Sequence, residues 1–522
     1  MKKVLFIIVF FYINLCSADE DIYQAEYKPL KCIGVVSEYE KRFMAKWTFK
    51  ATGGSGSLVD IRYNNKKREG KIRTSVYENG NLYGRGKWIG RTSSRIYKLI
   101  ISIAIPMILS NISTPLLGLI DTSIIGQISI EQIGAIAIGS SILSFFYFCF
   151  GFLRMGTTGL IAQAYGKNDY DQIKNIIKKN LFMALIFGIF CIPSILIIKN
   201  ILITIFTDNV NIQIFTKSYI NIRIFGAPAT FLNFVIFGVL LGSNQPWKIF
   251  KLVLFINSLN IILDLYLGMY LGLNIKGIAI GTIISEYAGV IFGLYYIKST
   301  ITLLDILNQK RFFKDKFSLL FKANINLFIR TFFILMSILM FTAIGSRLSE
   351  TLLAANAILI IFQMFLSYSL DGFAQATEVL LGNEYGKKNK NNITKIIISS
   401  GLISFVFAIL YTIIFYFFSM NIIEIITPID SILIEIKNYT VWIIISPLIS
   451  FLAFQLDGAF IGANKTKIMR NTVIISFSIY IICLIIFVPI FSNHGLWASF
   501  IIFMLLRGLL LLSEYKKLYQ FN

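Results

Sequence analysis

Histidine is almost absent from this sequence, whose 522 residues include a single copy, His494. Metal sites built from several histidines are therefore excluded, and histidine-based catalysis is disfavoured. The five cysteines are scattered, without the close pairs that metal or redox sites need. The chain also lacks the Gly-rich loop ending in Gly-Lys-Ser or Gly-Lys-Thr that binds nucleoside triphosphates. We expect no metal, no bound cofactor and no ATP hydrolysis, and the sequence does not read as that of an enzyme.

Charged residues are also scarce, at 15% of the chain against 56% apolar residues. A water-soluble fold of this length needs many more charges to cover its surface. Apolar stretches of about 20 residues recur from Leu99 to the C-terminus, and each can cross a hydrocarbon core about 30 Å thick. The sequence therefore predicts an integral membrane protein that is surrounded by lipid.

The charges that remain are mostly basic, with 49 lysines and arginines against 27 acidic residues. They lie in short loops and form no stripe with interleaved aromatic residues, so nucleic acid is not an expected partner. Alternate loops, such as those around Lys167 and Lys387, carry most of them. This asymmetry predicts that both termini of the transmembrane body lie in the cytoplasm. We expect the membrane to be a bacterial inner membrane.

The N-terminal region differs from the rest of the chain. Residues 1–18 combine Lys2 and Lys3 with an apolar run and small residues, a pattern typical of a signal peptide. Residues 19–94 are polar and predict a small β-rich segment. A cleaved signal would place this segment outside, which conflicts with a cytoplasmic start of the first span. We interpret residues 1–94 as an upstream reading frame joined to the membrane body; a native fusion of unusual topology is the alternative.

From residue 97 onward the sequence predicts an all-α fold of twelve transmembrane helices. The predicted spans of the first half are residues 97–126, 132–161, 174–199, 217–242, 247–271 and 275–298. Those of the second half are residues 322–347, 352–383, 393–418, 433–463, 467–491 and 495–515.

The two halves resemble each other at an offset of about 220 residues. The matches include Tyr165-Gly166-Lys167 with Tyr385-Gly386-Lys387, and Gly238, Gly242 and Asn244 with Gly458, Gly462 and Asn464. Because each half has an even number of spans, the axis relating them runs along the membrane normal. We expect two six-helix lobes, residues 97–298 and 322–522, joined by a cytoplasmic linker, residues 299–321. Rocking of such lobes would give alternating access.

Several motifs carry a family resemblance. They are Ile105-Pro106-Met107, Gly118-Leu119-Ile120-Asp121-Thr122, Arg154-Met155-Gly156-Thr157-Thr158-Gly159, Leu370-Asp371-Gly372 and Leu456-Asp457-Gly458. In this order they resemble the motifs of multidrug and toxic compound extrusion (MATE) transporters, and of their DinF branch in particular. The resemblance covers about residues 97–520 and leaves residues 1–94 without a counterpart.

Carboxylates inside apolar spans are costly unless paired, protonated or bound to a cation, so each marks a candidate site. Asp121 lies in the first predicted span and Asp264 in the fifth. Asn260 precedes Asp264 by four residues, so the two side chains share one helix face. Neither aspartate has a carboxylate at its repeat partner, which suggests a task specific to the first lobe. The alternative role is a neutral, hydrogen-bonded aspartate that locks helix packing.

The resemblance implies a role for these residues. DinF-type exporters use such an aspartate pair as their coupling site, which here corresponds to Asp121 and Asp264. The polar network around that site corresponds to Asn260, Tyr219 and Thr282, and a helix-bending proline corresponds to Pro106. Protons or sodium ions would be the coupling ions, because both suit carboxylate oxygens.

The second lobe has carboxylates of its own, Asp371, Glu378 and Asp457. They are candidates for contact with a cationic substrate or for a second ion site. Structural pairing with Arg330 or Arg507 is the alternative. Arg154, Arg330 and Arg223 lie near the ends of their predicted spans, and we interpret them as anchors that reach the membrane surface.

The resemblance thus implies a secondary multidrug exporter, expected to be a monomer, that exchanges protons or sodium for cationic or amphipathic drugs and toxins. A flippase for a lipid-linked precursor is the alternative, and it would need a cavity lined with cationic residues. A membrane aspartyl protease is disfavoured because the Gly-x-Gly-Asp context is absent around Asp121 and Asp264.

Overall fold

The structure, a computed structural model, describes residues 94–125, 130–298, 317–426 and 429–521, together with six strands between residues 22 and 91. It divides into two compact units, Met1–Ile96 and Tyr97–Asn522. The predicted signal segment, residues 1–18, and most of the predicted linker, residues 299–321, lie outside the described residues.

The strands of the first unit are antiparallel. They are β1 (Ile22–Tyr27), β2 (Leu30–Val35), β3 (Ala45–Lys50), β4 (Gly56–Asn64), β5 (Glu69–Glu78) and β6 (Asn81–Arg91). β1 pairs with β2, and β3 to β6 form a four-stranded meander with a bulge between Val76 and Tyr77. The strands fall within the segment in which alternating polar and apolar residues predict β structure. The origin of residues 1–94 stays a prediction.

The first lobe of the second unit has six candidate membrane spans in the described residues. Its helices are α2 (Ser94–Ile125), α3 (Ile130–Cys149), α4 (Phe152–Gly166), α5 (Tyr170–Phe206), α6 (Val210–Arg223), α7 (Ala227–Gly242), α8 (Pro246–Leu263) and α9 (Asn274–Ile297). A short break at Phe150 and Gly151 separates α3 from α4 within one span. A 3₁₀ turn, η1 (Ile224–Gly226), joins α6 to α7, and a π-helix, η2 (Asp264–Tyr270), follows α8.

The second lobe begins after the linker. Its helices are α11 (Phe317–Leu348), α12 (Glu350–Gly386), α13 (Lys390–Ile426), α14 (Asp430–Gly462) and α15 (Thr466–Ser513), followed by the 3₁₀ turn η3 (Tyr515–Tyr519). α15 is 48 residues long and is interrupted at Ser492, where φ is 51°. It therefore holds two spans, since one span needs only about 20 residues. The predicted twelve-helix, two-lobe architecture is confirmed.

The internal repeat is visible in the backbone. Asn168 and Lys388 both adopt a left-handed conformation, and so do Asn244 and Asn464. Each pair occupies equivalent positions in the two halves, directly after α4, α12, α7 and α14. Three of the four are asparagines, which tolerate this conformation better than most residues. The same turn recurs in both lobes.

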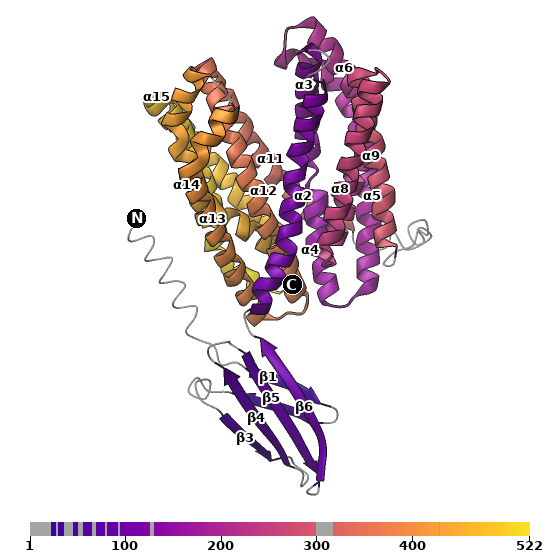
Figure 1. Ribbon diagram of the computed structural model, residues 1–522, viewed down its shortest axis with the longest axis vertical. Helices are drawn as coiled ribbons and strands as arrows, with labels where there is room; N and C mark the ends of the chain where they lie inside the picture. The colour runs from indigo at the N-terminus through magenta and orange to yellow at the C-terminus, as the bar shows by residue number, and fades with distance from the viewer. Residues whose placement is uncertain are drawn as a thin grey trace. The chain divides into compact units, whose positions relative to one another are not determined.

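The two lobes meet at the end of the body that carries Gly166 and Gly386. Figure 1 shows the helix bundles converging toward one end and diverging toward the other. A Cβ added at Gly166 would overlap the carbonyl oxygen of Asn383, and one at Gly386 would overlap that of Gln163. These contacts are reciprocal, because Gly166 and Gly386 are repeat partners, and so are Gln163 and Asn383. Gln163 also donates a hydrogen bond of 2.7 Å to the carbonyl oxygen of Gly462.

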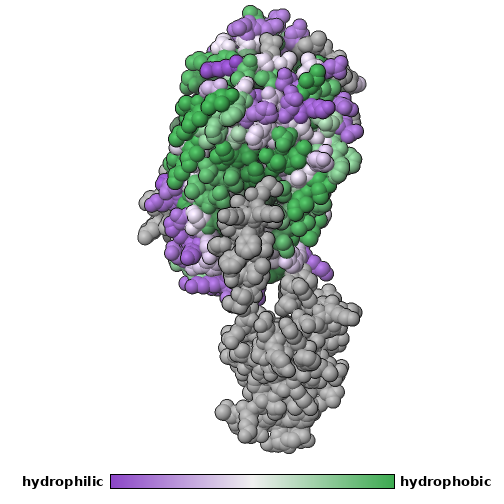
Figure 2. Space-filling model, turned by 90° about the vertical axis from the view of Figure 1, so that its left-hand side faces the viewer, coloured by the Kyte–Doolittle hydropathy of each residue, from purple (hydrophilic) through white to green (hydrophobic). Residues whose placement is uncertain are grey.

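The surface of the helical unit fits a lipid environment. Figure 2 shows hydrophobic residues over the middle of one face and hydrophilic residues mainly toward its two ends. Large apolar side chains of this unit, such as Ile197 and Ile485, are 76% and 69% exposed. Helices exposed in this way suit hydrocarbon, since every backbone polar group of a helix interior is satisfied within the helix.

Candidate functional site

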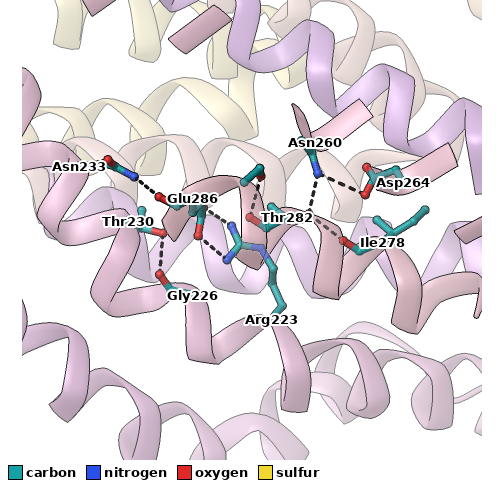
Figure 3. Close-up of polar contacts among 10 residues, drawn as sticks. Arg223, Gly226, Thr230, Asn233, Asn260, Asp264, Ile278, Thr282 and Glu286 are labelled. Carbon is teal, nitrogen blue, oxygen red and sulfur yellow. Dashed lines mark hydrogen bonds and ion pairs between the residues drawn. The ribbon is translucent and has the colours of Figure 1, made fainter. Parts of the chain in front are cut away.

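Asn260 is the centre of a buried polar group in the first lobe. Its Nδ2 donates to Oδ1 of Asp264 and to Oγ1 of Thr282, each at 3.2 Å (Figure 3). Asn260 and Asp264 are both 0% exposed. The four-residue spacing on α8 places them on one face, as predicted, and α9 brings Thr282 to the same amide. The structure therefore joins three of the predicted site residues.

The local backbone brings α9 close to the carboxylate. Asp264 ends α8 and begins the π-helix η2. A Cβ added at Gly281 would lie 2.5 Å from Oδ1 of Asp264, so only glycine permits this approach. π-Helical turns are rare and occur frequently at functional sites.

The other predicted site residues of the first lobe are Tyr219, Asp121 and Pro106, and the structure describes the side chains of Tyr219 and Pro106. Tyr219 is buried on α6, where its ring packs on Gly139 of α3. Asp121 lies on α2, but its side chain is outside the described residues. Pro106 is buried on the same helix, and its carbonyl oxygen accepts a hydrogen bond of 2.7 Å from Oγ of Ser110. A contact between Asp121 and Asp264 therefore stays a prediction.

A second buried group lies one turn farther along α9. Glu286 forms a bidentate ion pair with Arg223 of α6, with Nη2 to Oε1 at 2.5 Å and Nη1 to Oε2 at 3.0 Å (Figure 3). Nδ2 of Asn233 donates to the backbone oxygen of Glu286 at 3.0 Å. The guanidinium also lies over the ring of Tyr147, 5.7 Å from its centroid. Since Thr282 and Glu286 are four residues apart, the two groups share a face of α9.

The interpretation of Arg223 as a surface anchor is wrong. Its side chain is 11% exposed and is held by a carboxylate inside the lobe. Sequence reasoning missed Glu286 altogether, although it is a carboxylate within an apolar span, which is the signal that identified Asp264.

The second lobe holds a cluster of opposite charges. Asp457 of α14 accepts hydrogen bonds from Nη2 of Arg330 on α11 and, at 2.7 Å, from Nη2 of Arg507 on α15. The three side chains are at most 7% exposed. Asp457 is therefore paired with arginines of its own lobe, which is the structural alternative given above. The interpretation of Arg330 as a surface anchor is wrong.

Asp371 and Glu378 lie on α12, next to this ion-paired cluster. Glu378 is 2% exposed and lies near Thr158 of α4, across the lobe boundary. Arg154, also on α4, lies close enough to both carboxylates to interact with them electrostatically. The second lobe's carboxylates therefore face cations that the protein itself supplies.

Comparisons with known proteins agree with this architecture. The MatE family model matches residues 106–266 and 327–486, once in each lobe. DNA damage-inducible protein F of Escherichia coli is 31% identical over 423 residues, which cover 80% of this chain and 92% of that protein. A probable multidrug resistance protein NorM of Thermotoga maritima is 24% identical, over 71% of this chain and 81% of that protein.

The fold is also found among solved structures. A mutant of the Vibrio cholerae MATE transporter VcmN superposes with a TM-score of 0.75 at 17% identity. The superposition covers 82% of this chain and 99% of the Vibrio chain. At this level of identity the likeness concerns the arrangement of the helices.

Proposed function

This chain belongs to the multidrug and toxic compound extrusion family of membrane transporters, and on that premise we propose that it exports cationic or amphipathic organic compounds in exchange for protons or sodium ions. Membership makes it a multi-pass multidrug efflux transporter and not an enzyme. We further propose the coupling ion, the coupling residues and the substrates. We also propose that the chain acts as a monomer in a bacterial inner membrane, with both termini in the cytoplasm.

The observation that carries the proposal is the group of Asp264, Asn260 and Thr282. A carboxylate that is 0% exposed within a membrane span is stable only when neutralised or paired. Carboxylate, amide and hydroxyl oxygens are also the ligands that small hard cations prefer. A proton or sodium ion taken up at Asp264 would change the charge next to the amide of Asn260, which donates to this carboxylate.

Contacts between the lobes support alternating access. The end that carries Gly166 and Gly386 is closed by backbone-to-backbone packing. The loops at that end carry the lysine-rich segments, so we infer that the closed end faces the cytoplasm. The lobes would then be arranged for release to the outside, and reopening inward would require separation of α4 from α12.

α2 offers a route from the ion site to this boundary. Pro106 removes a helical hydrogen bond and allows α2 to bend. Five residues later on the helix, Nδ2 of Asn111 donates at 3.1 Å to the carbonyl oxygen of Tyr368 on α12 in the opposite lobe. A bend of α2 that follows ion uptake would therefore act directly on the second lobe.

The flippase alternative is not favoured by the charges observed. Three buried or half-buried arginines, Arg154, Arg330 and Arg507, lie near the lobe boundary, but they face Asp371, Glu378 and Asp457. The cluster is balanced in formal charge, so it offers no surplus of cations to a pyrophosphate. Because two guanidinium groups already hold Asp457, Asp371 and Glu378 are the better candidates for contact with a cationic substrate.

The test is efflux of a fluorescent organic cation from proteoliposomes under separately imposed proton and sodium gradients. We expect one of the gradients to drive efflux, and Asp264→Asn to abolish the gradient-driven part while binding of the dye persists. Asp430→Asn, at an exposed position at the start of α14, is the matched control and should transport normally. Efflux that ignores both gradients, or that survives Asp264→Asn unchanged, would overturn the proposal.

A further inference from the structure

A cavity of about 690 Å³ lies between α3, α4 and α5 of the first lobe and α11 of the second. Eight of its sixteen lining residues are phenylalanines, and none of the residues that line it in the described structure is charged. We call this cavity the aromatic cleft. It is separate from the group around Asn260, none of whose members lines it.

Rings from both lobes meet in the aromatic cleft. Phe150 and Phe187 of the first lobe have centroids 5.5 Å apart, and Phe328 of the second lobe lies 6.3 Å from Phe150 and 6.0 Å from Phe152. These distances are typical of favourable aromatic pairs. A flat apolar group can insert among such rings, and a rocking motion of the lobes would change the spacing between them.

The aromatic cleft opens toward the bilayer. Phe190 and Phe332, which lie on its rim, are 70% and 36% exposed on helices that are long and apolar enough to span the membrane. The mouth is therefore bathed by hydrocarbon, and any ligand that enters here must first dissolve in the membrane. Charged compounds are poorly suited to this route, because no acidic side chain among the described lining residues would receive them.

Two polar side chains, Ser194 and Asn324, interrupt the apolar lining, and the hydroxyl of Ser194 donates to the carbonyl oxygen of Phe190. Asn324 of α11 is 3% exposed, its Oδ1 lies against Gly156 of α4, and its Nδ2 has no hydrogen-bond partner among the described residues. Buried donors are almost always paired, because an unpaired donor loses its hydration without compensation. An acyl chain of a lipid would fill the aromatic cleft but would leave this amide unpaired.

We propose that the aromatic cleft binds neutral aromatic compounds that carry a hydrogen-bond acceptor, such as a ketone or an amide carbonyl, and that reach it from the membrane. The aromatic part lies among Phe150, Phe187 and Phe328, and the acceptor receives the Nδ2–H of Asn324. The cleft's role as an entry site for export rests on the proposed function, whereas the binding itself needs no ion gradient.

Photolabelling with benzophenone tests this site, because benzophenone is a neutral diaryl ketone that reacts with neighbouring C–H bonds under light. The purified protein is placed in phosphatidylethanolamine–phosphatidylglycerol liposomes without a gradient, and labelled peptides are mapped by mass spectrometry. We expect saturable labelling in residues 145–152 and 325–332. Labelling that rises linearly with benzophenone and is spread over all lipid-facing helices would overturn the proposal.

Two variants separate binding from folding. Asn324→Leu keeps the size of the side chain but removes the donor, and it should weaken labelling by about fivefold, the loss expected for one hydrogen bond. Phe328→Leu should weaken labelling as well, and this variant tests the site if Asn324→Leu does not fold. Phe418→Leu, at a lipid-exposed position of α13 away from the aromatic cleft, is the matched control and should label like the original protein. Equal labelling of all three variants would contradict the proposed contacts.

The outcome is independent of energy coupling. Intact labelling combined with efflux that ignores both gradients would count against the proposed function alone. Gradient-driven efflux of the dye combined with unsaturable labelling would count against the proposed binding site alone.

Discussion

Arg223 and Glu286 form a bidentate ion pair between α6 and α9, one helical turn from Thr282 in the group that contains Asp264. The pair places a full positive and a full negative charge beside the proposed ion site. The side chains of Arg223 and Glu286 are 11% and 13% exposed, so protein largely encloses the ion pair. The first lobe therefore contains a fixed ion pair next to a carboxylate that accepts a hydrogen bond from the neutral amide of Asn260.

Breaking the Arg223–Glu286 pair should destabilise the protein strongly. Glu286→Gln leaves a guanidinium buried without its counter-charge, which costs about 3–5 kcal/mol. Thermal unfolding in detergent measures the loss. The control is Glu514→Gln, which breaks the exposed pair with Lys517 and should cost at most about 1 kcal/mol. Equal effects of the two substitutions would show that the buried pair contributes no more to stability than the exposed pair does.

Removing the amide of Asn260 should impair coupling more than stability. Asn260→Leu deletes the hydrogen bonds to Asp264 and Thr282, at a cost of about 1–3 kcal/mol. We expect gradient-driven efflux to fall sharply in proteoliposomes. Asn257→Leu, on the same helix, loses among the described residues a single hydrogen bond of 3.5 Å to the carbonyl oxygen of Ser113 and should retain transport. If both variants transport equally well, the amide has no part in coupling.

A methyl group at the lobe contact should open the closed end. Gly166→Ala and Gly386→Ala each place a Cβ onto a carbonyl oxygen of the other lobe, an overlap that costs about 1–3 kcal/mol. Spin labels at Lys167 and Lys387 should then report a larger share of long distances. Gly134→Ala meets its nearest neighbour at 3.4 Å and should leave the distribution unchanged. An unaltered distribution in all three variants would mean that these glycines do not control the closed end.

Asp457 should be essential for the second lobe's stability. Asp457→Asn leaves Arg330 and Arg507 facing each other without the carboxylate, and we expect a loss of about 3–5 kcal/mol in detergent unfolding. Asp208→Asn, at an exposed loop position, is the control and should change the unfolding temperature little. A variant with normal stability but altered drug efflux would instead assign Asp457 to substrate contact.

Properties that follow from local periodicity were determined by the sequence itself. Runs of apolar residues define the twelve spans, because a helix must be apolar over about 20 residues to cross the membrane. The four-residue spacing of Asn260 and Asp264 fixes their common face, and the repeat relates Gly166 to Gly386 before any packing is known. These features depend on one helix, or on a comparison of the chain with itself.

Contacts between helices were decided only by the tertiary structure. Thr282 reaches Asn260, Glu286 reaches Arg223, and Arg330 and Arg507 reach Asp457 because of how the helices rotate and cross. An arginine near the end of an apolar span looks the same in sequence whether it extends to the membrane surface or pairs inside the lobe. The choice depends on whether a carboxylate on another helix lies within reach, and that depends on packing among many residues distant in the chain.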